Sequence, residues 1–308
     1  MYLQNIYNKR KKTGRAENIS GLLMALIPVV GFALFGFIPL VIAIVISFMY
    51  IPGRGDIANG TFNGIQNFVE VLSDPMFWKS IGNTLIMALS LPICIVIALI
   101  IGYLLTKNIK GTKVFRSIYF IPYVCCAVSV TLMWELIFNQ NHGILNSWLG
   151  LDRETAIPWL TNSDYYLGVM VLIGVWSGTA YGIVLYGAAL TNVNSTLYEA
   201  AKVDGANSFQ SFIHITLPAI SPTTFFLLTT GIIGALQEFV RPQILGGGGN
   251  GAGPNNDGLT IVFYLYRNAF SYDGTMGIAA ATAFLLALMI LIVTVINFKV
   301  SKKWVSYD

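Results

Sequence analysis

The stretch EAAKVDGANSFQSFIHITLP, from Glu199 to Pro218, is a polar insert between two strongly apolar runs of the chain. A glycine, Gly205, divides it into two halves. The apolar side chains of the second half recur at the spacing of one helical face, at Phe209, Phe212, Ile213 and Leu217. The insert therefore predicts two short helices with a glycine turn between them, and the flanking runs must decide where these helices lie.

The composition of the whole chain predicts a membrane protein. Of its 308 residues 55% are hydrophobic and 10% are charged, whereas an ordinary soluble domain has roughly 25% charged residues. So few charges cannot cover the water-facing surface of a chain of this length. The formal net charge of +4 does not indicate nucleic-acid binding, because the placement of the basic residues explains it.

Six apolar runs are long enough to cross roughly 30 Å of hydrocarbon, which takes about 20 helical residues. They predict an all-α, polytopic fold with spans at about 21–51, 81–105, 117–138, 167–190, 223–245 and 277–298. The first run is too long for the core of a signal peptide, and no small-residue cleavage site follows it, so it is counted as a span. We expect a basic arm at 1–20, a single six-span domain at 21–308, and a connecting loop at 191–222.

Lysine and arginine predict the orientation of the spans. Thirteen of the 18 basic residues lie before the first span, between spans two and three or four and five, or after the sixth. Because such residues gather on the cytoplasmic side, both termini and the 191–222 loop are predicted to be cytoplasmic.

The insert has its own start and stop signals. Thr196 and Glu199 fit a capping box, and Ala200 favours the helix that would follow. Gly205 is suited to end that helix, and a second one is expected to start at Asn207 or Ser208.

An amphipathic second helix either lies in the lipid interface or docks in a groove of a partner. Because Lys202 is the only basic residue of the insert, attraction to anionic lipid is weak and docking is favoured.

Residues that carry chemistry are sparse. The three cysteines fall inside predicted spans, where such side chains usually act as small buried hydrophobes, and His142 and His214 are predicted on opposite sides. The glycine-rich loop at 245–258 lacks the Lys-Ser/Thr of a phosphate-binding loop. We expect no catalytic residue, metal or cofactor in this chain, so any ATP and Mg would be bound by another chain.

The insert resembles the EAA loop of permease subunits of type I ATP-binding-cassette importers. That pattern is Glu-Ala-Ala, three residues, Gly, nine residues and Ile-x-Leu-Pro, and every defined position is matched. Further stretches resemble the carbohydrate branch, closest to the maltose-type first permease in a shorter six-span form: 83–84, 115–117, 120–123, 138–139, 143–146, 176–178 and 253–254. The likeness covers roughly 67 to 303.

The resemblance implies a permease subunit of a binding-protein-dependent importer for a sugar or oligosaccharide, in the bacterial cytoplasmic (inner) membrane. The implied partners are a second, related but different permease, two ATPase subunits, an external solute-binding protein and membrane lipid, with no nucleic acid. The residues implied for coupling to an ATPase are Glu199, Ala200, Ala201, Gly205, Phe209, Phe212, Ile215, Leu217 and Pro218.

The resemblance also implies a substrate pathway along the fifth span. Gly231, Gly234, Ala235 and Glu238 fall on one helical face, and their counterparts in the maltose-type subunit line the sugar site, as do those of Gly178 and Tyr181. An intramembrane carboxylate is a functional hypothesis by default, and Glu238 and Tyr181 are the expected contacts. Gln237 and Glu135 are weaker candidates. The competing interpretation of Glu238 is an ion pair with Arg241.

Two other functions stay open at this point. An importer permease for a non-sugar solute, such as glycerol phosphate or another polyol derivative, would have the same loop. An ion-coupled secondary carrier would need no ATPase, but such proteins usually have charged relays in mid-membrane. Only Glu135 and Glu238 fit that description, and both are predicted near outer ends of spans.

Overall fold

The computed structural model describes residues 21–51, 59–106, 111–248, 251–271 and 275–306, apart from the side chains of Lys113 and Arg116. The basic arm predicted at 1–20 lies outside the described residues, as do Lys107 and Lys110. The described chain is mainly helical, as predicted. Its strands are β1 (Met49–Tyr50) and β2 (Thr61–Phe62), which pair antiparallel.

Most of the helices follow one another with short connections, whereas residues 149–162 separate α8 from α9. In chain order they are η1 (Ala33–Phe37), α2 (Ile38–Ile46), α3 (Gln66–Ser73), α4 (Pro75–Ala88), α5 (Ser90–Thr106), α6 (Thr112–Val124), α7 (Ala127–Ile137), α8 (Ile144–Trp148), α9 (Ser163–Thr191), α10 (Ser195–Val203), α11 (Ser208–Ser211), η3 (Phe212–Thr216), α12 (Leu217–Ala219), α13 (Ser221–Leu236), α14 (Val240–Leu245), η4 (Pro254–Asn256), α15 (Ile261–Phe270) and α16 (Met276–Ser301). Side-chain oxygens cap the first turns of six of them, at Asp74, Asn162, Asn194, Asn207, Thr260 and Thr275.

Five stretches of the described chain are each long and apolar enough to cross a membrane: Gly21–Ile46, Pro75–Thr106, Ser163–Thr191, Ser221–Leu245 and Met276–Ser301. A sixth is obtained when Ser117–Val124 and Ala127–Ile137 count as one span, although the two helices meet at 105°. The first span ends at Ile46, because the chain turns there into the β1–β2 hairpin rather than continuing to residue 51.

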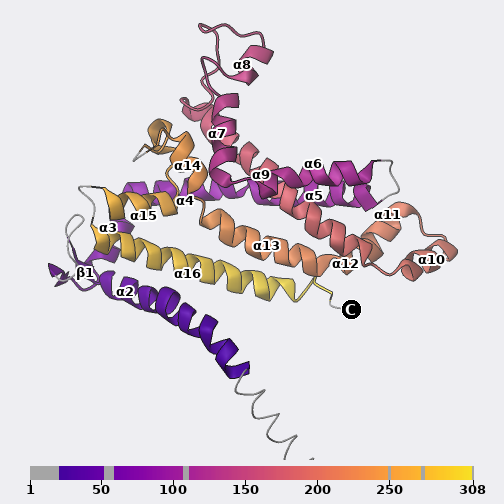
Figure 1. Ribbon diagram of the computed structural model, residues 1–308, viewed down its shortest axis with the longest axis horizontal. Coiled ribbons are helices and arrows are strands. Elements are labelled where there is room, and N and C mark those ends of the chain that lie inside the picture. The colour runs from indigo at the N-terminus through magenta and orange to yellow at the C-terminus, as the bar shows by residue number, and fades with distance from the viewer. Residues whose placement is uncertain (1–20, 52–58, 107–110, 249–250, 272–274, 307–308) are drawn as a thin grey trace, which may run out of the picture.

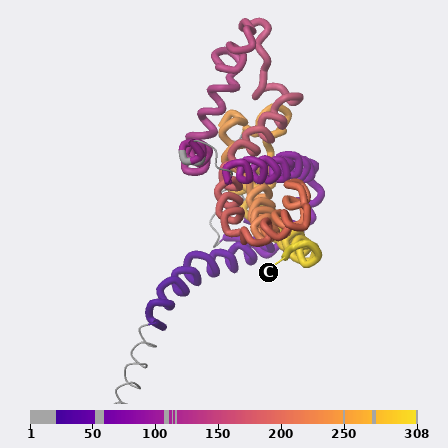
Figure 2. Tube along the Cα trace, turned by 90° about the vertical axis from the view of Figure 1, so that its right-hand side faces the viewer, coloured from indigo at the N-terminus to yellow at the C-terminus, as the bar shows by residue number. Residues whose placement is uncertain are grey.

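The spans run side by side, and their connections gather at opposite ends (Figure 1). α5, α6 and α9 form one layer, and α13 and α16 pack beside it. α10 to α12 lie at one end of this bundle, whereas β1, α3 and α15 lie at the other. α7 and α8 project from one side of the bundle, as the turned view confirms (Figure 2). The polar insert is therefore at the opposite end of the bundle from the β1–β2 hairpin.

Small residues let α5 and α9 approach closely. A Cβ added at Gly182 of α9 would lie 2.6 Å from the Cβ of Ala98 on α5, and one added at Gly178 would lie 2.9 Å from Cys94 Sγ. Gly174, one turn earlier, faces Ser90 in the same way. This Gly-x-x-x-Gly-x-x-x-Gly series is the close-packing pattern of membrane helices, and it fixes the wall on which the candidate site is built.

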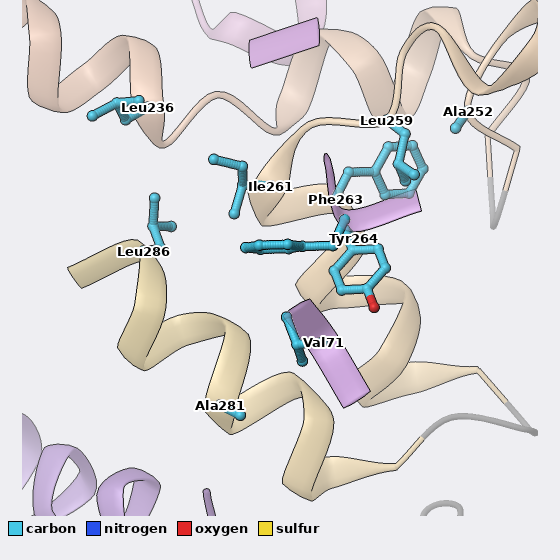
Figure 3. Packing of buried hydrophobic residues seen from close by; sticks show 10 residues of the cluster. Val71, Leu236, Ala252, Leu259, Ile261, Phe263, Tyr264, Ala281 and Leu286 are labelled. Carbon is cyan, nitrogen blue, oxygen red and sulfur yellow. The ribbon is translucent and has the colours of Figure 1, made fainter. Parts of the chain in front are cut away.

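A buried cluster joins five helices at the end of the bundle opposite α10 (Figure 3). Its members come from α3, α4, α13, α15 and α16 and include Val71, Leu236, Phe263, Tyr264 and Leu286. The Tyr264 hydroxyl also donates to Asp74 Oδ2 at 2.7 Å, just before α4. Leu236, the last residue of α13, is thus held in the core where that helix ends.

The third span differs most from the sequence prediction. Instead of one helix over 117–138, the chain takes extended dihedral angles at Cys125 and Cys126, and α7 leaves in a new direction. Both cysteines are exposed, so the prediction that they are buried hydrophobes is wrong; Cys94 is buried as predicted. Residues 117–129 are all exposed apart from Pro122, so neither α6 nor α7 has a packed neighbour that covers the two thiols.

Candidate functional site

A cavity of about 530 Å³ lies where two spans break, between α6 and α7 and between α13 and α14. Its wall also includes the start of α5 and the middle of α9. Six of the eight residues predicted for the substrate pathway line it: Gly178, Gly231, Gly234, Ala235, Gln237 and Glu238. Residues up to 60 positions apart are therefore brought to one hollow by the packing of α13 against α5 and α9.

The fifth span does not continue to Glu238 as one helix, as the sequence analysis expected. α13 ends at Leu236, because Pro242 has no N–H for the Glu238 carbonyl four residues earlier and its ring would clash with that carbonyl. Thr260 Oγ1 donates to the Glu238 carbonyl instead, at 2.7 Å. Glu238 thus leaves the helical face predicted for it and still lines the cavity.

Glu238 forms an ion pair with Arg241, which confirms that alternative of the sequence analysis. Arg241 Nη2 bonds to Glu238 Oε2, and the two side chains are only 19% and 17% exposed. Arg241 Nη1 lies 3.4 Å from the Met170 carbonyl of α9. A Cβ at Gly174 would lie 2.7 Å from Nη1, so the absence of a side chain there makes room for the guanidinium. Both members of the pair line the cavity.

The rest of the lining is uncharged. Its hydroxyl groups are partly committed to their own helices, since Ser90 Oγ donates to the Met87 carbonyl and Thr131 Oγ1 to the Ala127 carbonyl. These oxygens keep lone pairs that can accept a hydrogen bond. Gln237 is exposed and supplies both a donor and an acceptor. The cavity therefore offers a few polar groups in a mostly apolar wall.

Two predicted pathway residues lie elsewhere. Tyr181 lines a neighbouring pocket of about 180 Å³, and its ring stacks on Tyr123 with a centroid separation of 5.0 Å and an interplanar angle of 18°. Tyr123 itself lines the main cavity, so Tyr181 supports the wall from behind. Glu135 lies in a third pocket, of about 450 Å³, beside Gly246 and Pro254 of the glycine-rich loop.

Arg241, Tyr123 and Cys125 also line the cavity and were not predicted to do so. An arginine within an apolar run was a usable signal, because buried charges mark functional sites in membranes. Pro122 was a weaker signal of a bend near Tyr123. Cys125 reaches the cavity through the break between α6 and α7, whose position no local pattern indicates.

The polar insert folds as two helical arms around Gly205, whose φ of +80° is the left-handed conformation predicted for it. The first arm, α10, is capped by Asn194, which accepts from Thr196 N at 3.0 Å. The capping box predicted for Thr196 and Glu199 is therefore wrong: asparagine is a better cap than threonine, and its position lets the helix start earlier. The second arm begins at Ser208, one of the two predicted starts, with Asn207 as its N-cap and a capping box to Gln210.

The two arms are fastened to each other and to the bundle. Tyr198 and Thr216 share a hydrogen bond of 2.8 Å, and Thr216 is completely buried. The Phe212 ring lies 5.1 Å from that of Tyr103 on α5, and Leu217 packs on the cluster between α5 and α9. These contacts make the insert a shaped extension of the spans rather than a loose loop.

The predicted coupling residues fall into two groups. Phe212, Ile215, Leu217 and Ala201 are partly covered, and of these Phe212 and Leu217 contact the bundle. The exposed members are Glu199, Ala200, Gly205, Phe209 and Pro218. Phe209 is 72% exposed and Val203 beside the turn is 88% exposed, so the tip presents apolar side chains to its surroundings.

Within the described ranges, no group of three or more His, Cys, Asp or Glu side chains is placed to hold a metal ion.

Comparison with known proteins identifies one family. Residues 86–305 match the model for a binding-protein-dependent transport system inner membrane component. The chain is 29% identical to the lactose transport system permease protein LacF of Rhizobium radiobacter, over 96% of this chain and 98% of that one. It is 32% identical to the arabinooligosaccharides transport system permease protein AraP of Bacillus subtilis (strain 168), over 89% and 85% of the two chains.

A solved structure has the same fold over nearly the whole chain. It is the crystal structure of a bacterial ABC transporter involved in the import of the acidic polysaccharide alginate. One of its chains superposes with a TM-score of 0.74 at 26% identity, covering 91% of this chain and 94% of that one.

Proposed function

The chain belongs to the binding-protein-dependent transport system inner membrane components, and from that membership we propose that it is the permease subunit of an ATP-binding-cassette importer for a sugar or oligosaccharide. It is a multi-pass protein of the bacterial cytoplasmic membrane and forms half of the translocation pathway. Relatives named for lactose and arabino-oligosaccharides support a carbohydrate substrate, and the alginate importer extends the range to acidic chains.

The observation that carries the proposal is the cavity at the two broken spans. Its volume of about 530 Å³ falls in the range of roughly 300–1,000 Å³ typical of small-molecule sites. Sugar hydroxyls can donate to the Glu238 carboxylate and accept from Arg241 or Gln237. The face of Tyr123, which Tyr181 supports, suits the C–H face of a sugar ring.

The insert between α9 and α13 is proposed as the site where ATP hydrolysis by a partner is coupled to transport. Its exposed tip, with Val203 and Phe209, fits a groove-binding helix whose apolar side chains act as anchors. Because Phe212 and Leu217 fix the insert on α5 and α9, movement of its tip would be passed to the helices that line the cavity. Nucleotide binding would then bias a two-state switch of the pathway.

The complex that follows from this assignment contains four kinds of protein. We propose that a second, related permease completes the pathway, that two ATPase subunits bind ATP and Mg, and that an external solute-binding protein delivers the sugar. This chain would hold no nucleotide, cofactor or metal of its own.

Affinity purification of the tagged chain from its host membrane, followed by uptake assays in proteoliposomes, tests the assignment. An ATPase and a second permease are expected to co-purify, and sugar uptake should require ATP on the ATPase side. Uptake by vesicles that contain this chain without any ATPase would contradict the proposal and favour an ion-coupled carrier.

A further inference from the structure

We infer that the Glu238–Arg241 pair makes this permease select uncharged sugars and reject sugars that carry a carboxylate or an amine. The inference rests on the proposed function and deepens it, because a carbohydrate importer can serve neutral or acidic substrates. It concerns the part of the pathway that this chain lines.

The charge balance of the cavity is the first observation. Among the described residues that line it, Glu238 and Arg241 are the charged ones, and they are paired with each other. Each side chain is less than one-fifth exposed, so water screens the pair only partly. The cavity therefore has two strong polar groups and no net charge.

The second observation is that the guanidinium is held in place. Its Nη1 reaches toward the Met170 carbonyl of α9, and the bare backbone of Gly174 gives it the room to lie there. Thr260 holds the carbonyl of Glu238 from α15 at 2.7 Å. Because three different helices fix the pair, Arg241 is not free to swing away from Glu238 toward a ligand carboxylate.

A charged sugar would upset this balance. A uronate entering the cavity would add a negative charge whose natural partner, Arg241, is already bound to Glu238, and an amino sugar would add an unpaired positive charge. Burying an unpaired charge is costly. Uncharged hydroxyls carry no such cost, because they can donate to the carboxylate and accept from the guanidinium through charge-assisted hydrogen bonds. The pair therefore favours one class of sugar by rejecting the others.

Cys125 provides the reporter for a direct test. Cys94 and Cys125 both line the cavity, but Cys125 is exposed to the reagent whereas Cys94 is buried. In the purified transporter complex, with Cys126 changed to serine, sugars that occupy the cavity should slow the labelling of Cys125 by a maleimide. The probes are glucose, galactose and mannose disaccharides, each with its matched uronate and amino-sugar forms. With Glu238 and Arg241 intact, a neutral disaccharide should protect at a concentration at least about tenfold below that of its charged counterparts.

Charge-neutralising variants distinguish selection from simple support. E238Q should lower the protecting concentration of the uronate by about tenfold, and R241Q should do the same for the amino sugar. The double variant E238Q/R241Q is again uncharged and should return to the neutral preference. If the pair had only a structural role, E238Q and R241Q would not favour sugars of opposite charge, and the double variant would not restore the preference for neutral sugars. The matched control is K79Q/D257N, which removes the ion pair of 3.1 Å that lies outside the cavity and should leave selectivity unchanged.

Three results would overturn the inference. Equal protection by neutral and charged disaccharides in the unaltered pair would do so without any variant, and would leave the cavity as a sugar site. If E238Q and R241Q changed the protecting concentration of every sugar by the same factor, the pair would have only a structural role. Protection by no disaccharide would remove the cavity as the site, whereas co-purification of the ATPase would still test the permease assignment separately.

Discussion

Pro242 follows Glu238 by four residues, and this spacing ends the fifth span's first helix beside the cavity. In a continuous helix the Glu238 carbonyl would accept from the backbone nitrogen of residue 242, and proline has no hydrogen to give. Thr260 donates from 22 residues away and satisfies that carbonyl at 2.7 Å. The break turns Glu238 and Arg241 into the cavity wall, so one proline, one threonine and one ion pair together shape the site.

Replacing Thr260 with valine should destabilise the protein. The hydroxyl is completely buried, donates to the Glu238 carbonyl and accepts from Phe263 N, so its loss leaves both groups unsatisfied. We expect a loss of about 1–3 kcal/mol in the free energy of unfolding, measured as a lower melting temperature of the purified chain in detergent. The serine variant keeps the hydroxyl and is the control. Equal melting temperatures for T260V and the unaltered chain would contradict this account of the break.

The close approach of α5 and α9 can be tested with two glycines of the same helix. An alanine at Gly182 would place its Cβ 2.6 Å from that of Ala98, so the helices would have to move apart. Overpacking of this kind costs about 1–3 kcal/mol. The matched control is G168A, since nothing lies within 4 Å of the added Cβ there. G182A should melt at a lower temperature than G168A, and equal melting would mean that the two helices are not held at this distance.

The sequence predicted what depends on local pattern. The apolar runs predicted the spans, and the residues of the insert predicted the glycine turn and the cap at Asn207. Helix length and capping can be predicted because they depend on residues that are close in sequence. Contacts between distant residues escaped prediction. The donor for the Glu238 carbonyl is Thr260, the N-cap of α15, and beyond the bend at Cys125 α7 packs on α14, a contact that the local sequence does not indicate.

The capping error has a different origin. Thr196 and Glu199 fit the capping-box pattern, but Asn194 two residues earlier is a better N-cap than threonine and accepts from Thr196 N at 3.0 Å. Of the predicted pathway residues, Gly178 of α9 and those on or directly after α13 line the cavity, because α13 packs against α5 and α9. Tyr181 and Glu135 do not, because their distance from the cavity depends on the tertiary positions of α9 and α7.

Removing the phenyl ring of Phe209 should weaken binding of the ATPase. The ring is 72% exposed at the tip of the insert, so it contributes little to the fold and is available to a partner. Truncating an aromatic anchor at an interface costs about 2 kcal/mol or more, which is roughly a thirtyfold loss of affinity. We expect F209A to reduce the ATPase that co-purifies, while the melting temperature stays unchanged. W148A, which removes an 85% exposed ring on α8, is the control and should not affect ATPase recovery.

A substitution at Gly205 tests whether the relative orientation of the two arms of the insert matters, rather than any single contact with the ATPase. Its φ of +80° is strained for other residues and impossible for proline, whose φ is fixed near −65°. G205P should therefore misplace the two arms relative to each other and uncouple ATP hydrolysis from uptake, while the spans still insert. The measurement is the ratio of sugar transported to ATP hydrolysed in proteoliposomes, and an unchanged ratio would show that the turn does not set the docked shape.

Two neighbouring cysteines allow the cavity to be mapped without any change to its charged pair. Cys125 lines the cavity, whereas Cys126 is exposed but is not among the lining residues. A bound sugar should therefore slow maleimide labelling of Cys125 in C126S and leave the labelling of Cys126 in C125S unaffected. Both thiols lie in the same bend, are exposed and react with the same maleimide. A global change in structure would therefore alter both labelling rates, and comparing the two variants removes that effect. Equal protection of both thiols would indicate that sugar changes the conformation of the bend. Protection of Cys126 alone would indicate that the sugar binds on the other side of α7, outside this cavity.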